Sequence, residues 1–106
     1  MARREDKTVA VVGTILEEEV VLSLAEICRA AQLPAERVIE LVQEGIVEPI
    51  GENSESWNFR GVSLRRIRCA QRLGEDLGIN TPGVALALDL LDELRYLRAQ
   101  LRQFDQ

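Results

Sequence analysis

Apolar residues recur at intervals of three and four along four stretches of the chain, and this spacing predicts α-helices. The stretches are residues 24–31, 35–44, 62–77 and a last one that starts near residue 81 and runs to residue 104. Such a stripe lines one face of a helix and is buried against a neighbour. The residues expected to face the core are Leu24, Ile27, Cys28, Ala31, Val38, Leu41, Val42, Leu64, Ile67, Ala70, Leu73 and Leu77.

Residues that start and stop helices stand at the ends of the first two stretches. Ser23 and Glu26 have the spacing of a capping box, which starts the first helix. Pro34 fits the first turn of the second helix, because its missing N–H is not needed there. Gly45 follows the second stretch and is a natural terminator.

Two short helices joined by two or three residues predict a helix-turn-helix. The second helix can cross the first closely only where the facing residues are apolar or small. Counted from Ile27, such residues recur at the required offsets, at Ala31, Leu33, Val38 and Leu41. The turn position that glycine often occupies is Gln32 here, which is a departure from the usual pattern.

The pattern is different on either side of these helices. Residues 1–7 are polar, and residues 8–22 are rich in β-branched residues, which favours one or two short strands. Residues 46–59 hold two short apolar runs around a Gly/Asn/Ser turn, which predicts a β-hairpin, or wing. Trp57 and Phe59 alternate with a polar residue and are expected to pin the hairpin to the core.

The last helix begins after Gly78, with Asn80 or Thr81 as its cap and Pro82 in its first turn. It carries a seam with alternating spacings of three and four, typical of a heptad repeat. The seam residues are Ala87, Leu90, Leu94, Leu97, Leu101 and Phe104. A second stripe, Val84, Leu88 and Leu91, covers only the first half. We expect the seam to form a homodimer; the alternative is that it folds back on its own domain.

Charge is segregated along the chain, whose net charge is −5. Residues 17–56 hold ten Glu against Arg29 and Arg37, a sum of −8. A block of this density repels phosphate and attracts a basic partner, although a solvated surface is the simpler interpretation. The second helix and the wing, which would meet DNA in a winged helix-turn-helix, are acidic. The remaining basic face belongs to the third helix, with Arg65, Arg66, Arg68 and Arg72.

Catalysis has little support in the sequence. Histidine is absent and Lys7 is the only lysine, so no nucleophile has a candidate base. The two cysteines, Cys28 and Cys69, are expected to pack in the core rather than bind metal or form a disulfide. We therefore expect no enzyme activity, no cofactor and no metal. The sequence also shows no membrane-spanning stretch or signal peptide, and we expect a cytoplasmic protein.

Several stretches, over about residues 19–104, together resemble the chaperone-modulator CbpM family, which has a MerR-like helix-turn-helix fold. These stretches are Glu44-Gly-Ile-Val-Glu-Pro49, Trp57-Asn-Phe59, Arg65-Arg-Ile-Arg-Cys-Ala-Gln-Arg-Leu73 and Asp76-Leu-Gly-Ile-Asn-Thr-Pro-Gly-Val-Ala-Leu-Ala-Leu-Asp-Leu-Leu91. The fold class expected is thus mainly α: a MerR-like winged helix-turn-helix with a β-hairpin wing and a long C-terminal dimerisation helix. The expected divisions are an N-terminal tail or short strand at 1–18, the winged domain at 19–78 and the dimerisation helix at 79–106.

The resemblance implies a function that the residue pattern alone does not supply. Members of this family bind the J-domain of a CbpA/DnaJ-type co-chaperone and inhibit its stimulation of a DnaK-type chaperone. The alternative is a MerR-type DNA-binding transcriptional regulator, which the acidic second helix argues against. From charge, the candidate partner-binding residues are Glu36, Glu40, Glu44, Glu48, Glu52 and Glu55. The competing face holds Asp89, Asp92 and Glu93, for which a solvated surface is the favoured interpretation over a docking point.

Overall fold

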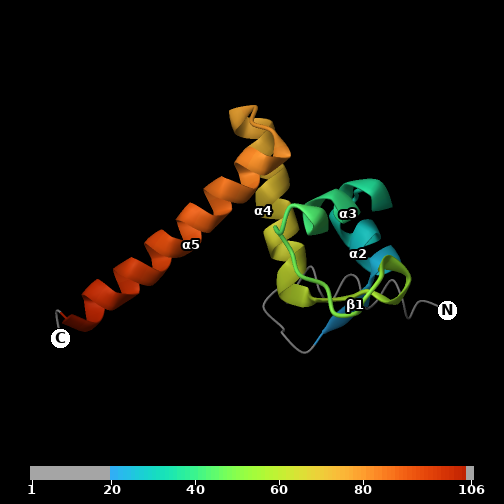
Figure 1. Ribbon diagram of the computed structural model, residues 1–106, viewed down its shortest axis with the longest axis horizontal. Coiled ribbons are helices and arrows are strands. Elements are labelled where there is room, and N and C mark those ends of the chain that lie inside the picture. Colours follow the sequence, from blue (N-terminus) through green and yellow to red (C-terminus); the bar gives the residue numbers. More distant parts are fainter. Residues whose placement is uncertain (1–19, 105–106) are drawn as a thin grey trace.

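The computed structural model of the chain describes residues 20–104 and is mainly helical (Figure 1). A small domain of short elements packs against one side of a central helix, and a long last helix leaves this domain at an angle. The elements in chain order are β1 (Val21–Ser23), α2 (Leu24–Ala31), α3 (Ala35–Gln43), the 3-10 turn η1 (Ser54–Ser56), β2 (Asn58–Arg60), α4 (Gly61–Leu77) and α5 (Thr81–Phe104).

Helices α2 and α3 form the predicted helix-turn-helix. The capping box is present, because the Ser23 hydroxyl accepts from the Glu26 N–H at 3.2 Å while the Glu26 carboxylate accepts from the Ser23 N–H at 2.9 Å. Gln32 adopts the left-handed conformation with φ of 59°, and the next N–H, of Leu33, donates to the Cys28 carbonyl at 3.0 Å. A glutamine thus closes the turn in a conformation that favours glycine.

The end of α3 is fixed by the same kind of motif with its usual residue. Gly45 has φ of +78° and donates to the Val42 carbonyl at 2.9 Å. The following N–H, of Ile46, donates to the Leu41 carbonyl at 2.9 Å. Leu41 and Ile46 are both buried, so their packing in the core accompanies these hydrogen bonds. Together they fix the direction in which the chain leaves α3.

The strand β2 pairs with β1 in an antiparallel sheet, with Phe59 opposite Leu22. The expected wing is present as a loop closed by one bridge, in which Ile50 and Asn58 exchange hydrogen bonds of 2.7 and 2.9 Å. The loop curls through η1 instead of continuing as a ladder. Gly51, at φ of +123°, is required there, because an added Cβ would lie 2.7 Å from the Ser56 carbonyl oxygen.

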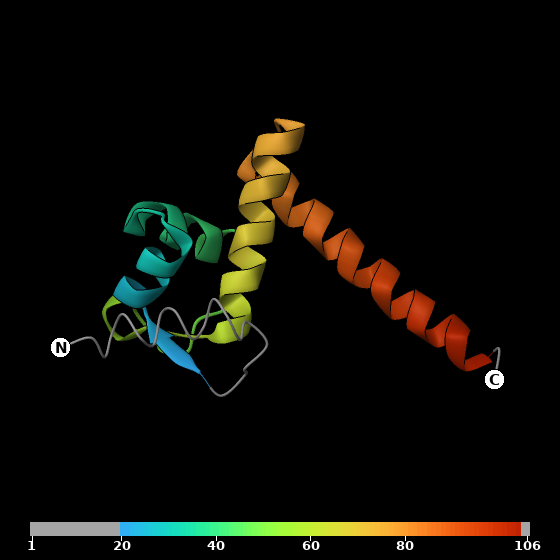
Figure 2. The ribbon, with the colours of Figure 1, turned by 180° about the vertical axis from the view of Figure 1, so that it is seen from behind.

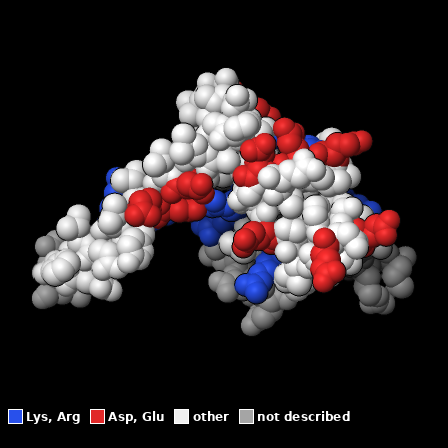
Figure 3. Space-filling view, viewed as in Figure 1, with Lys and Arg blue, Asp and Glu red and all other residues white. Residues whose placement is uncertain are grey.

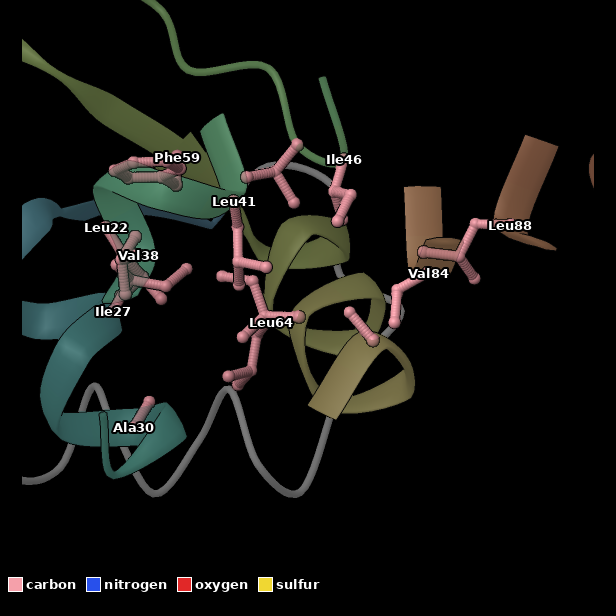
Figure 4. Close-up of a cluster of buried hydrophobic side chains, with 13 residues drawn as sticks. Leu22, Ile27, Ala30, Val38, Leu41, Ile46, Phe59, Leu64, Val84 and Leu88 are labelled. Carbon is pink, nitrogen blue, oxygen red and sulfur yellow. The ribbon is translucent and has the colours of Figure 1, made fainter. Parts of the chain in front are cut away.

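The core lies between the helix-turn-helix, the sheet and α4, and it extends to the first turns of α5 (Figure 4). Phe59 is fully buried, and Trp57 meets it edge-on with ring centroids 6.0 Å apart. The prediction for Leu77 is wrong: its side chain is 62% exposed. This residue is the last of α4, directly before Gly78, so its helical spacing is correct but its side chain is left largely uncovered.

The connection to α5 follows the predicted signals. Gly78 ends α4 in the left-handed conformation, and the Asn80 side chain caps α5 by accepting from the Gly83 N–H at 2.8 Å. Val84 and Leu88 are buried against the domain, whereas the second half of α5 extends away from it (Figure 2). The predicted tail and strand at 1–18 lie outside the described residues. None of the described helices has the length and apolar character needed to cross a membrane.

Candidate partner-binding surface

Glu36 and Glu40 of α3 and Glu44, its C-terminal cap residue, are all exposed at a spacing of four. Glu36 and Glu44 form no ion pair with another described residue. Glu40 differs, because it accepts from the Arg37 guanidinium at 2.9 Å and from the Thr81 hydroxyl at 3.1 Å. The hydrogen bond from Arg37 and then the one from Thr81 lower the pKa of Glu40. Within residues 20–104, this row therefore offers two carboxylates without an ion pair and one that is held by its own domain.

Arg37, the only cation of α3, is turned toward the neighbouring helices. Its Nε donates to the side-chain oxygen of Gln71 on α4 at 2.7 Å, and Nη1 donates to the Thr81 hydroxyl at 2.7 Å. The side chain is 24% exposed. The sequence showed one arginine among three glutamates, and the structure uses that arginine as a tie between α3, α4 and α5. The outer side of α3 is consequently more acidic than its composition suggested.

The wing adds three glutamates to the row formed by Glu36, Glu40 and Glu44. Glu48, Glu52 and Glu55 are exposed and form no ion pair with any residue between 20 and 104. Acidic side chains gather over α3 and the wing, while basic ones gather in the angle between α4 and α5 (Figure 3). We call the six residues Glu36, Glu40, Glu44, Glu48, Glu52 and Glu55 the acidic surface. Carboxylates in this arrangement attract cations and repel a phosphate backbone.

The competing acidic face on α5 is largely occupied by arginines. Asp92 pairs with Arg66 at 3.1 Å and with Arg95 at 3.4 Å, and Asp89 lies 4.0 Å from Arg66. Only Glu93 is without an ion pair in the described part of the chain. These carboxylates hold α5 to α4, so they are less available to a partner than those of the acidic surface.

The arginines of α4 divide into two kinds that the sequence could not distinguish. Arg66 donates through Nε to the Ile46 carbonyl as well as pairing with Asp92, and Arg68 donates to the Ala30 carbonyl at 3.1 Å. Arg65 and Arg72 are exposed. Two of the four cations thus bond within the domain. Arg65, Arg68 and Arg72 are nevertheless all exposed and, at spacings of three and four, lie along one face of α4.

A groove beside the acidic surface was not predicted from the sequence. It has a volume of about 500 Å³ and lies between the loop after α3 and the start of α4. Its lining includes the exposed apolar side chains of Ile50 and Val62 together with Glu48. No local signal marks it, because Ile50 and Val62 come together only through the pairing of the wing with β2.

The seam of α5 is uncovered in the single chain. Leu90, Leu94, Leu97, Leu101 and Phe104 are all exposed, and Ala87 is half-buried. Leu86, which the heptad spacing left out, is also exposed, and its spacing of four from Leu90 extends the stripe toward the start of α5. Within the described residues the seam therefore does not fold back on its own domain.

Both cysteines are free thiols at the edge of the core, as expected of packing residues. Burial raises the pKa of the Cys28 thiol, and the nearby negative charge of Glu36 raises it further. A raised pKa keeps the thiol protonated and unreactive. Among the described residues no cluster of His, Cys, Asp or Glu is suited to hold a metal ion.

The mainly helical fold and its helix-turn-helix are typical of helix-turn-helix regulatory proteins. Residues 22–106 match the model of the MerR HTH family regulatory proteins, and this matched range includes the wing and α5. The predicted MerR-like winged helix-turn-helix is thereby confirmed.

Comparison with individual relatives narrows this class. The chain is 39% identical over 94 residues to the chaperone modulatory protein CbpM of Coxiella burnetii, covering 89% of each chain. It is 41% identical over 79 residues to the protein of the same name from Pseudomonas putida strain GB-1, covering 74% of this chain and 78% of the relative. With the protein of that name from Pseudomonas entomophila it shares 40% identity over 79 residues. The chain belongs to the CbpM family.

Proposed function

We propose that this chain is a non-enzymatic chaperone modulator that binds the J-domain of a CbpA/DnaJ-type co-chaperone and inhibits its stimulation of a DnaK-type chaperone. Membership of the CbpM family supports the chaperone role. The observation that carries the choice of partner is the polarity of α3, whose glutamates face solvent while Arg37 is committed to Gln71 and Thr81.

The proposed mechanism is competition for a basic helix. A J-domain presents a strongly basic helix that docks on an acidic surface of the DnaK-type chaperone. The acidic surface of this chain offers carboxylates to the same helix, so that a bound J-domain no longer reaches the chaperone. Opposite charges speed the encounter and make binding sensitive to salt.

The binding is carried by glutamates that form no ion pair within residues 20–104. These are Glu36 on α3, Glu44 at its C-terminal cap, and Glu48, Glu52 and Glu55 on the wing. Glu40 contributes charge but is oriented by Arg37 and Thr81. The face with Asp89, Asp92 and Glu93 is the weaker candidate, because Arg66 and Arg95 partly neutralise it.

The protein is further proposed to act as a homodimer in the cytoplasm. The apolar stripe of α5 supports the dimer, because five of its six seam residues are exposed in a helix that extends away from the domain. Exposed leucines at heptad spacing are normally covered by a second helix. A second copy of the chain provides such a helix.

The first test is binding of the full chain to the J-domain, and separately to duplex DNA, at low and physiological salt. We expect J-domain binding that weakens with salt, loss of ATPase stimulation of the DnaK-type chaperone and no DNA shift. A salt-sensitive DNA shift without J-domain binding would instead establish the transcriptional regulator.

The second test locates the site by charge reversal. The variant Glu36→Lys/Glu44→Lys leaves Glu40 and its partners intact and is expected to abolish J-domain binding while the chain stays folded. The matched control is Glu75→Lys/Asp76→Lys, which makes the same change in net charge at exposed positions of α4. Equal effects of the two variants would show a response to net charge only and rule out α3 as the site.

A further inference from the structure

The groove beside the acidic surface has an apolar wall that the domain itself does not cover. Ile50 is 49% exposed and Val62 is 43% exposed, and both line the groove. The backbone between them is not free to turn these side chains inward. The apolar wall of the groove is therefore set by the backbone of these two residues.

Strand pairing holds Ile50 on the outer side. Ile50 lies directly opposite Asn58 in the bridge, and residues that face each other across a pair point to the same side of the sheet. Asn58 is exposed, whereas the next residue, Phe59, is fully buried on the other side. Ile50 must accordingly share the solvent side with Asn58.

Helix geometry holds Val62 outward in the same way. Val62 is the second residue of α4, and the two residues that follow it, Ser63 and Leu64, are buried. The start of the helix is fixed by the Gly61 N–H, which donates to the Val20 carbonyl at 2.9 Å. Val62 thus forms a rigid wall facing the loop that carries Pro49 and Ile50.

The charges around this groove are mainly negative. Glu48 lines it, and Glu44 and Glu52 are exposed close by in sequence. Arg66, also in the lining, is engaged with Asp92 and the Ile46 carbonyl, and Arg60 lines the groove as well. In the lining, Glu48 and Arg60 form no ion pair with another residue between 20 and 104. A ligand in the groove therefore meets both charges there, and Glu44 and Glu52 add negative charge beside it.

We propose that this groove receives a large aliphatic or aromatic side chain of the same cationic helix that the acidic surface attracts. The proposal rests on the proposed function and adds an apolar anchor to it. The occupant is an amphipathic helix whose basic residues lie toward α3 and whose apolar residue enters between Ile50 and Val62. The glutamates then govern the association rate, and the groove governs the dissociation rate.

The test separates these two contributions kinetically. Association and dissociation rates of the J-domain are measured with the full chain at two salt concentrations, for Ile50→Ala, Val62→Ala and Glu44→Gln/Glu48→Gln. We expect each apolar truncation to raise the dissociation rate by about tenfold and to leave the salt dependence of association unchanged. The glutamine pair is expected to slow association and flatten its salt dependence.

Leu77→Ala is the matched control, because Leu77 is a comparably exposed apolar residue that does not line the groove. The J-domain is expected to dissociate from this control at the same rate as from the unmodified chain. Faster dissociation of this control to the same degree, or unchanged dissociation of Ile50→Ala, would overturn the groove as anchor. Absence of J-domain binding by the unmodified chain would instead refute the proposed function itself. If Val62→Ala disturbs the start of α4, the dissociation rate measured with Ile50→Ala alone tests the groove as anchor.

Discussion

The Arg37 guanidinium donates a hydrogen bond of 2.7 Å to the hydroxyl of Thr81, which ties α3 to the first residue of α5. The Thr81 hydroxyl in turn donates to Glu40, and Arg37 also holds Gln71. Four polar side chains from three helices are thus joined where the chain turns back into the long helix. Thr81 is buried, so these hydrogen bonds are partly shielded from water.

Removing the guanidinium should destabilise the domain. Arg37→Met keeps most of the apolar stem but deletes the donors to Gln71 and Thr81, and we expect a loss of about 2 kcal/mol in the free energy of unfolding. Arg65→Met is the control, because Arg65 is exposed and has no polar partner among the described residues. Urea denaturation of both variants checks the difference, and equal stabilities would show that the junction contributes nothing.

The same junction predicts a response to acid. The pKa of Glu40 is lowered by Arg37 and Thr81, so the stability that it confers is present above the ordinary value of 4.5 and is lost as pH falls through the lower folded value. In Glu40→Gln this part of the pH dependence should disappear. Thermal unfolding between pH 7 and pH 3 measures it, and parallel pH curves for the two proteins would contradict the prediction.

A glycine at the turn of the helix-turn-helix should stabilise the protein. Gln32 holds φ of 59°, a conformation that costs a residue with a Cβ roughly 1 kcal/mol or more. Glycine avoids this cost but gains freedom in the unfolded chain, so we expect Gln32→Gly to add about 0.5 kcal/mol. Gln43→Gly, in the last turn of α3 where the backbone is helical, should destabilise instead.

The thiol of Cys28 should react slowly and respond to one neighbouring carboxylate. In a Cys69→Ser background, alkylation at pH 8 is expected to be slower than for an unperturbed thiol, because burial and Glu36 raise the pKa of Cys28 above 9.0. Glu36→Gln removes the smaller cause and should speed the reaction, whereas Glu44→Gln should not. Since the folded pKa is raised, stability conferred by the neutral thiol is complete below pH 9 and declines at higher pH.

The stripe on α5 predicts a specific effect on assembly. Leu97→Lys places a charge in the middle of the seam and should convert the proposed dimer to monomer, as measured by sedimentation equilibrium. Tyr96→Lys is the control, because Tyr96 is equally exposed but lies off the seam. A monomeric unmodified chain, or identical behaviour of the two variants, would contradict dimerisation through this seam.

Helix ends were the features most accessible from the sequence, because their causes are local. Ser23 with Glu26, Gly45, and Asn80 each act on backbone groups within four residues, and all of them function as predicted. The heptad spacing likewise identified α5, although its partner remains a proposal. In each case the residues that determine the structure are neighbours in the sequence.

The features that were missed depend on contacts between distant segments. No pattern within α3 indicates that Arg37 reaches Thr81, 44 residues later, and none within the wing indicates that β2 pairs with β1. The groove at Ile50 and Val62 arises from the pairing of Ile50 with Asn58. The helical spacing that placed Leu77 on the apolar face of α4 likewise does not show that its side chain is left exposed. The charge of the candidate site could therefore be predicted, but not its apolar wall.

The guanidinium of Arg66 donates a hydrogen bond to the carbonyl of Ile46 and also forms an ion pair with the carboxylate of Asp92. One residue inserted in α4 after Arg66 would rotate everything downstream by about 100° and advance it by roughly 1.5 Å. Asp92 would then swing out of reach, although every leucine of α5 kept its own repeat. The number of residues between the wing and α5 is thus as strictly constrained as the chemical character of those residues.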